Sequence, residues 1–288
     1  DSRAPFYAVV VSSLANVALD LWFVAGLGWQ VAGAAAATVL SQGVSAVLVV
    51  TALMRRTDAC KLVLREMRFY GAQIQRILRV GLPAGIQSTF FNISNVLIQA
   101  AVNSFGEVFV SASAASGNIE NFLYLIVNSF HQTAVNFVGQ NSGAMRYDRV
   151  KKTTWLCEIY AVIFGIVTGV LMCVFAPQLL SLYITDSQEA ISIGIARMYI
   201  TVLPYCLFAI QDVITGVLRG LGASFISMLL SVLGICGIRI LWIYTIFQIP
   251  QFHTQRVLYM SYPLSWVITF VIQLAAFLAV FRKLERRQ

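Results

Sequence analysis

Two polar side chains lie one helical turn apart inside the first apolar segment of the chain. Asn16 and Asp20 are four residues apart, so on a helix both project from the same face. Carboxylate and carboxamide oxygens together suit a hard monovalent cation, or a proton carried by the carboxylate. An ionisable group inside an apolar segment is costly and usually faces protein or water. We therefore expect Asp20 and Asn16 to belong to a cation site.

Later apolar segments carry further polar side chains that could line a substrate cavity. Glu120 lies on one helical line with Tyr124, Asn128 and His131, and Asp212 lies deep in another segment. The segment before Glu120 adds a stripe of amides at Gln87, Asn92, Asn95, Gln99 and Asn103. Such stripes either line a cavity or join helices through hydrogen bonds, and both alternatives stay open. We expect Glu120, Tyr124, Asp212 and the amides from Gln87 to Gln99 to face the cavity.

The remaining ionisable residues of the apolar segments have plainer explanations. Glu158 and Arg197 lie about one turn from the ends of their segments, so we expect both to snorkel. Arg239 lies deeper, and we expect it to satisfy a carboxylate or helix carbonyls, with Glu120 as one candidate partner. His131 is expected to be a packed residue rather than a proton relay.

The elements that position these residues are apolar throughout. Of 288 residues 59% are hydrophobic and 11% charged, whereas soluble domains average roughly 25% charged residues. A water-soluble fold could not hide so much apolar surface, so we predict an all-α integral membrane protein of about eight transmembrane helices. Pro204 should bend the sixth, because proline removes a backbone donor. The predicted spans are Phe6–Gly26, Val31–Met54, Leu82–Phe105, Val108–Val138, Thr154–Phe175, Ile193–Leu218, Phe225–Phe247 and Leu258–Phe281.

Charge clusters predict the topology. Basic residues gather in Arg55–Val80, after the fourth and sixth spans, and in the tail that holds Arg286 and Arg287. Neutral or acidic loops alternate with them, which places all the strongly basic segments on one side of the membrane. Both chain ends are then cytoplasmic, in a protein of the plasma (inner) membrane. The net charge of +8 follows this pattern, so it indicates contact with membrane lipid and not with nucleic acid.

The basic segment Arg55–Val80 also predicts the domain organisation. Its apolar residues recur at helical spacing, which favours an amphipathic helix on the inner leaflet, with an ordinary cytoplasmic loop as the alternative. We expect residues 1–54 to form one helix pair, 55–80 a basic amphipathic linker and 81–288 a six-helix lobe.

Enzymatic and metal-binding functions find no support in the residues. Five cysteines, among them Cys60, form no CxxC pair, and the chain has only two histidines. A metalloprotease would need His-Glu-x-x-His, and a phosphatase clustered His and Arg. We predict no enzyme, no bound metal and no cofactor apart from a coupling ion.

Five motifs resemble those of MATE (multidrug and toxic compound extrusion) transporters of the bacterial, DinF-like type. They are Asn16–Asp20, Gly33–Thr38, Gly81-Leu82-Pro83, Gly139–Lys152 and Gly216–Gly222. The resemblance implies twelve helices in two lobes, of which this chain would hold the last two helices of the first lobe, the linker and the second lobe. The chain begins at Asp1 and not at Met, which suggests a cut end with four helices missing. Residues 1–288 alone are then expected not to transport.

The resemblance also implies a function and a site. Asn16, Asp20 and Thr38 match the cation-coupling residues of the first lobe in DinF-like members. The implied activity is antiport, in which H⁺ or Na⁺ entry drives export of a small amphipathic or cationic drug by a protein that is monomeric when full length. Branches resembling NorM carry acidic residues where Phe91 and Phe208 stand here, and Asp212 lies one turn from the second. The alternative is a lipid-linked saccharide flippase of the same superfamily.

Overall fold

The computed structural model describes residues 3–57 and 61–285, so Cys60, Arg286 and Arg287 lie outside the described residues. These residues are helical almost throughout, as the fold prediction requires. The chain divides into two compact units, Asp1–Tyr70 and Gly71–Gln288.

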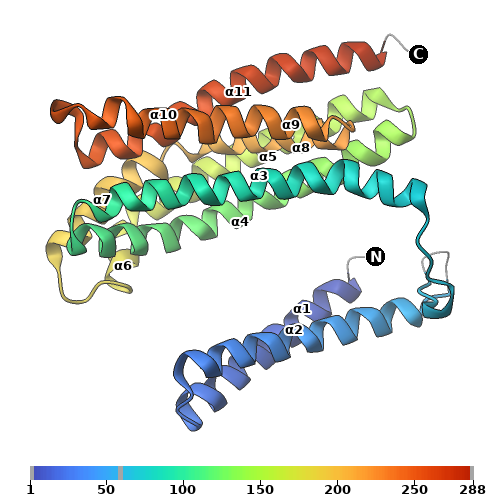
Figure 1. Ribbon diagram of the computed structural model, residues 1–288, viewed down its shortest axis with the longest axis horizontal. Coiled ribbons are helices and arrows are strands. Elements are labelled where there is room, and N and C mark those ends of the chain that lie inside the picture. The colour runs from blue at the N-terminus through green and yellow to red at the C-terminus, as the bar shows by residue number, and fades with distance from the viewer. Residues whose placement is uncertain (1–2, 58–60, 286–288) are drawn as a thin grey trace. The chain divides into compact units, whose positions relative to one another are not determined.

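The first unit is built around a helical hairpin (Figure 1). Its first arm is α1 (Arg3–Asp20), which passes directly into the π-helical segment η1 (Leu21–Gly26). Gly28 makes the turn with a φ of +68°, a conformation that favours glycine. The second arm is α2 (Gln30–Met54), and the change from α to π geometry falls at Asp20.

The second unit is a bundle of long helices (Figure 1). Within it α4 packs against α5, α7 and α8, and α8 also packs against α5 and α11. The core between these helices is made of small and branched side chains such as Ala112, Leu123 and Val217. The helices are α3 (Gly71–Asn103), α4 (Glu107–Gly143), α5 (Tyr147–Val174), α6 (Ala176–Ser181), α7 (Gln188–Thr201), α8 (Tyr205–Gly220), α9 (Ser224–Ser231), the π-helical η3 (Val232–Gly237), α10 (Ile238–Tyr244) and α11 (Gln255–Glu285).

The eight predicted spans correspond to eight helical stretches of the described residues. Five stretches are long and apolar enough to cross a membrane, and the bent pair of α7 and α8 makes a sixth. The other two are α3 and α4, which are 33 and 37 residues long but carry the polar stripes. Their low hydropathy follows from those stripes, because polar side chains within a bundle face protein or water and not lipid.

The predicted bend at Pro204 is confirmed. The axes of α7 and α8 differ by 48° across a short break, and Pro204 stands at the N-cap of α8. Proline lacks a backbone donor and fixes its own φ, so the helix restarts there in a new direction.

The prediction of a single amphipathic helix over residues 55–80 is wrong. The described part of Lys61–Tyr70 contains one short 3₁₀ turn, η2 (Leu64–Glu66), and the rest is non-helical. Residues 71–80 are the start of α3, which runs into the next predicted span without a break. The helical spacing of apolar residues therefore belongs to two different structures, one on each side of Tyr70.

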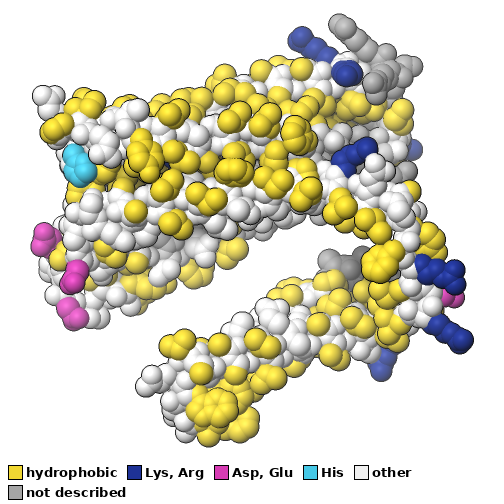
Figure 2. Space-filling model, viewed as in Figure 1, with side chains coloured by type: hydrophobic (Ala, Val, Ile, Leu, Met, Phe, Trp, Pro, Cys, Tyr) yellow, Lys and Arg dark blue, Asp and Glu magenta, His cyan; other side chains and the backbone are white. Residues whose placement is uncertain are grey.

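On the face of the second unit that Figure 2 shows, charged side chains differ in sign between the two ends of the bundle. Lys and Arg gather at the end where α3 begins and α11 finishes, and Asp and Glu gather at the opposite end. This distribution is the one that the predicted topology requires. The cytoplasmic placement of the basic end stays a prediction.

Candidate functional site

A pocket of about 650 Å³ lies within the second unit and contains most of the predicted cavity residues. Its volume falls in the range of roughly 300–1,000 Å³ that is typical of small-molecule sites. Its walls come from α3, α4, α7, α8, α11 and the stretch from η3 to α10. The predicted residues that line it are Asn92, Asn95, Gln99, Glu120, Tyr124 and Asp212.

The amides Asn92, Asn95 and Gln99 of α3 line this pocket. Gln99 donates to Asn103 of its own helix at 3.0 Å, and in the described residues Asn92 and Asn95 have no hydrogen-bond partner on another helix. Gln87 is the exception, and its assignment to the cavity is wrong. It is 5% exposed and accepts a hydrogen bond of 2.7 Å from Arg219. Its side chain is held in a contact between helices and is not among those that line the pocket.

The Glu120 carboxylate is paired inside the pocket. Arg197 Nη2 lies 3.0 Å from Glu120 Oε2, and Arg197 Nη1 donates to the backbone carbonyl of Ser113. The guanidinium also lies over the ring of Tyr259, 5.1 Å from its centroid. Snorkelling of Arg197 was therefore a wrong expectation, because its side chain turns into the bundle, where a carboxylate compensates its charge.

Arg239 forms no ion pair with Glu120, its candidate partner, in the described residues. Its Nε donates to Ser265 Oγ at 3.2 Å, and its guanidinium carbon lies 4.0 Å from the centroid of the Tyr262 ring. Both Arg239 and Tyr262 line the pocket. Arg239 is 7% exposed, so it is a deeply buried cation.

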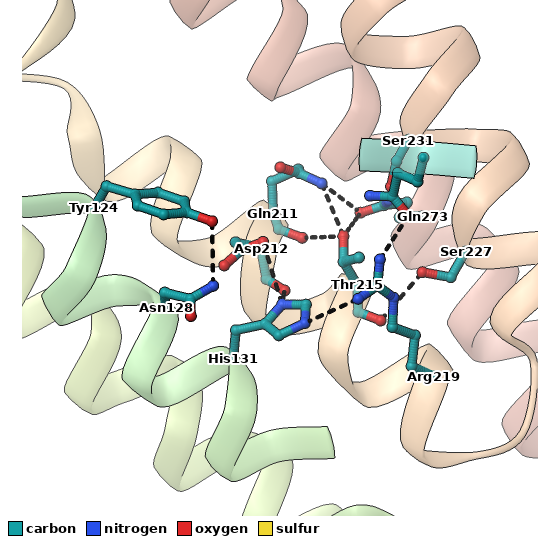
Figure 3. Close-up of polar contacts among 11 residues, drawn as sticks. Tyr124, Asn128, His131, Gln211, Asp212, Thr215, Arg219, Ser227, Ser231 and Gln273 are labelled. Atoms are coloured by element: carbon teal, nitrogen blue, oxygen red, sulfur yellow. Dashed lines mark hydrogen bonds and ion pairs between the residues drawn. The ribbon is translucent and has the colours of Figure 1, made fainter. Parts of the chain in front are cut away.

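Asp212 connects the pocket to a chain of polar contacts between α4, α8 and α3 (Figure 3). His131 Nδ1 lies 3.2 Å from Asp212 Oδ1 and 2.8 Å from the Asp212 carbonyl oxygen. On the other side of the imidazole, Nε2 lies 3.5 Å from Arg219 Nη1, and Arg219 continues to Gln87. His131 is buried, as expected, but it contacts a carboxylate that faces the pocket.

Gly216 is the residue that lets α8 approach α4 at this point. A Cβ atom on Gly216 would lie 2.8 Å from the His131 carbonyl oxygen and 3.4 Å from its ring. Any larger residue would push the two helices apart. The Gly216–Gly222 motif therefore has a packing role beside the Asp212–His131 contact.

A second polar network, behind Asp212, was not predicted from the sequence. Gln211 Nε2 and Thr215 Oγ1 both contact Gln273 Oε1 at 3.1 Å, and Gln273 Nε2 donates to Ser231 at 2.9 Å (Figure 3). All four residues are buried. Amide and hydroxyl bonds of this kind join helices within a membrane bundle.

Aromatic rings form another part of the pocket lining. Phe208 packs on Trp266 and Tyr205, with ring centroids 5.5 Å and 5.0 Å apart. Phe208 thus forms part of an apolar surface at the position where the resemblance puts an acidic residue in another branch. Trp266 and Tyr262 of α11 are pocket residues that sequence reasoning missed, since aromatic residues in a span are most often packing.

The three predicted cation-coupling residues lie in the first unit. Asp20 closes α1 where π geometry begins, and its buried Oδ1 has no hydrogen-bond partner in the described residues. π-Helical turns occur frequently at functional sites. The Thr38 hydroxyl donates to Ala34 of its own helix at 2.9 Å. In the described part of the chain, no hydrogen bond joins Asn16, Asp20 and Thr38 to one another.

Glu158 was expected to snorkel, and this was wrong. Both carboxylate oxygens are buried without a hydrogen-bond partner in the described residues. Its side chain lies along an apolar groove of about 610 Å³ between α5, α8 and α11. In the part of the chain that the structure describes, no hydrogen-bond donor reaches either oxygen, so Glu158 is an unusual buried group.

Comparisons with known proteins agree with this fold. The family model MatE matches residues 83–245. The probable multidrug resistance protein YoeA of Bacillus subtilis is 25% identical over 98% of this chain and 62% of its own length. An FAD transporter of Shewanella oneidensis is 24% identical over 84% of this chain and 53% of its own length. A crystal structure of MATE in complex with MaL6 has a TM-score of 0.89 at 19% identity, covering 97% of this chain and 63% of that one. The chain therefore spans less than two thirds of the length of these relatives.

Proposed function

This chain belongs to the MATE family of multi-pass membrane transporters, and we propose that it serves export of drugs or xenobiotics across the plasma membrane in exchange for H⁺ or Na⁺. The family is one of transporters and not of enzymes. The chain spans about 62% of the length of the relative YoeA. The activity and the substrates of the whole protein are therefore proposed.

The observation that carries the proposal is the mixed lining of the pocket. Asn92, Asn95 and Gln99 contribute amides to this lining, and Phe208 and Trp266 contribute aromatic rings. An amphipathic molecule of drug size can bury its aromatic part and keep hydrogen bonds for its polar part in such a pocket. The multidrug resistance protein among the relatives favours this function over a lipid-linked saccharide flippase.

The coupling site that we propose is Asp20, with Asn16 and Thr38. An unpartnered buried carboxylate oxygen gains a ligand when the group takes up a proton or Na⁺. Asp20 stands at the junction of α and π geometry, where a change in hydrogen bonding alters the direction of the helix most readily. The altered packing would shift the protein between inward-open and outward-open states, as alternating access requires.

Substitution of one aromatic residue of the pocket lining tests the proposal. We expect Trp266→Ala in the complete gene product to reduce efflux of an aromatic dye such as ethidium by about tenfold, because a large stacking surface is lost. Trp155→Ala is the matched control, since Trp155 is largely exposed on α5 and lies outside the pocket. Efflux is measured in vesicles energised by either a pH or a Na⁺ gradient, with expression matched. Equal efflux by the parent and Trp266→Ala would place the substrate elsewhere.

A further inference from the structure

Arg239 is held in place from one side only. It belongs to the first turn of α10, directly after the π-helical segment η3. Ser265 accepts from Nε, and the Tyr262 ring covers one face of the guanidinium at 4.0 Å. Within the described residues, the one hydrogen bond of the Arg239 side chain is made by Nε. A guanidinium presents its two Nη groups along one edge, which suits a two-oxygen acceptor.

No carboxylate of the described residues forms an ion pair with Arg239. Glu120 is near enough to act on its charge, but the Glu120 carboxylate is bonded to Arg197 at 3.0 Å. Asp212, the other acidic residue of the pocket wall, faces His131 at 3.2 Å, with Arg219 beyond it. Both acidic residues of the pocket are therefore engaged by other cations or by histidine.

Arg239 is the unpaired cation of the pocket. The charged residues of its lining are Glu120, Asp212, Arg197 and Arg239, and Glu120 and Arg197 pair with each other. Asp212 contacts His131, so Arg239 keeps a positive charge in the wall that no carboxylate of the described residues contacts. A buried cation without a counter-ion is costly in a membrane protein, and an anion that entered the pocket would remove that cost.

From this arrangement we propose that Arg239 forms an anion-binding subsite, and that the transported substrates include aromatic molecules with a carboxylate or phosphate group. The acidic group would bind along the free edge of the guanidinium. Its aromatic part would lie against Tyr262 and Trp266, which line the same pocket. The inference rests on the proposed function, and it adds acidic aromatic molecules to the amphipathic and cationic drugs that are expected as substrates.

The test compares two ligands that differ in one acidic group. Binding of riboflavin and of riboflavin 5′-phosphate to the protein in phosphatidylcholine nanodiscs is followed by flavin fluorescence. We expect the phosphate to tighten binding by about tenfold, as charge-assisted hydrogen bonds typically do. Arg239→Gln should abolish this gain, so that riboflavin and riboflavin 5′-phosphate bind equally well, while Arg239→Lys should retain part of it. Arg282→Gln, at an exposed position of α11, is the control and should retain the whole gain.

A headgroup of an anionic lipid has the same chemistry as the acidic group of a substrate. The measurement is therefore repeated with phosphatidylglycerol in the nanodiscs. An unchanged gain assigns the subsite to a soluble substrate, whereas its loss would assign it to lipid and overturn the proposal.

The remaining outcomes separate this inference from the proposed function. If ethidium binds and riboflavin 5′-phosphate binds no better than riboflavin, the anion subsite is wrong and the efflux pocket stands. If neither dye nor flavin binds, the pocket itself is wrong. The comparison of two ligands in the unmodified chain decides the matter even if Arg239→Gln fails to fold.

Discussion

Glu120 of α4 and Arg197 of α7 form an ion pair at 3.0 Å inside the pocket, although 77 residues separate them in the chain. Arg197 keeps contacts with Ser113 and Tyr259, whereas Arg197 is the one hydrogen-bond partner of Glu120 in the described residues. The pair is largely buried, so each partner compensates a charge that water cannot reach.

This asymmetry predicts unequal costs for the two halves of the pair. Arg197→Gln leaves a buried carboxylate without a cation and should destabilise the protein by roughly 3 kcal/mol or more. Glu120→Gln should cost less, because Arg197 keeps its other contacts. The double variant should be more stable than the sum of the two single changes predicts, because the interaction between the partners is lost only once. The stabilities are compared by thermal melting in detergent. Strictly additive effects would show that the pair contributes no coupling energy.

Gly216 should tolerate no side chain. Gly216→Ala places a methyl group 2.8 Å from the His131 carbonyl oxygen, so we expect a lower melting temperature from the displaced helices. Gly143→Ala, near the end of α4, meets no atom within 4 Å and is the matched control. It should leave stability unchanged or raise it slightly, since alanine is the better helix former. Equal melting temperatures of the two variants would contradict the close approach of α4 and α8.

Glu158 should be dispensable for stability. Both of its carboxylate oxygens are buried without a partner, and a neutral amide is easier to bury than a carboxylate. Glu158→Gln should therefore leave the melting temperature unchanged or raise it. Glu120→Gln removes a carboxylate that has a partner, and should lower it. The idea fails if Glu158→Gln is the more damaging of the two.

Asp20 should control coupling. In the complete gene product, Asp20→Asn keeps shape and hydrogen bonding but removes the titratable charge, so substrate should still bind while gradient-driven export stops. Thr38→Ala should weaken export less, because it removes one neutral oxygen whose hydroxyl already bonds within its own helix. Efflux from energised vesicles is the measurement. Parental export by Asp20→Asn would make Asp20 a packing residue and direct attention to Glu120 and Asp212.

The topology can be tested at the acidic end of the second unit. With the native cysteines replaced, a cysteine at exposed position Asp186 should react with an impermeant maleimide from outside the cell. A cysteine at Arg282 should react only after the membrane is opened, because the basic end is predicted to be cytoplasmic. The reverse pattern of labelling would invert the orientation.

Local properties of the sequence determined the helices of this protein. Hydropathy, helical period and the missing donor of Pro204 act within a few turns of chain. They were enough to place eight helical stretches, the bend between α7 and α8 and the polar faces of α3 and α4. The same local signals failed over residues 61–70, where apolar spacing of helical period occurs in a segment that is mostly non-helical.

Only the tertiary structure decided which charges meet. Glu120 contacts Arg197 and not Arg239, Asp212 contacts His131, and Gln87 accepts from Arg219 in place of facing the pocket. Each contact joins helices far apart in the chain and depends on their relative rotation and depth. A helical wheel gives the face on which a residue lies, but the neighbour of that face is chosen by the packing of the whole bundle. The buried charge of Arg239, left without a carboxylate, is a product of that packing.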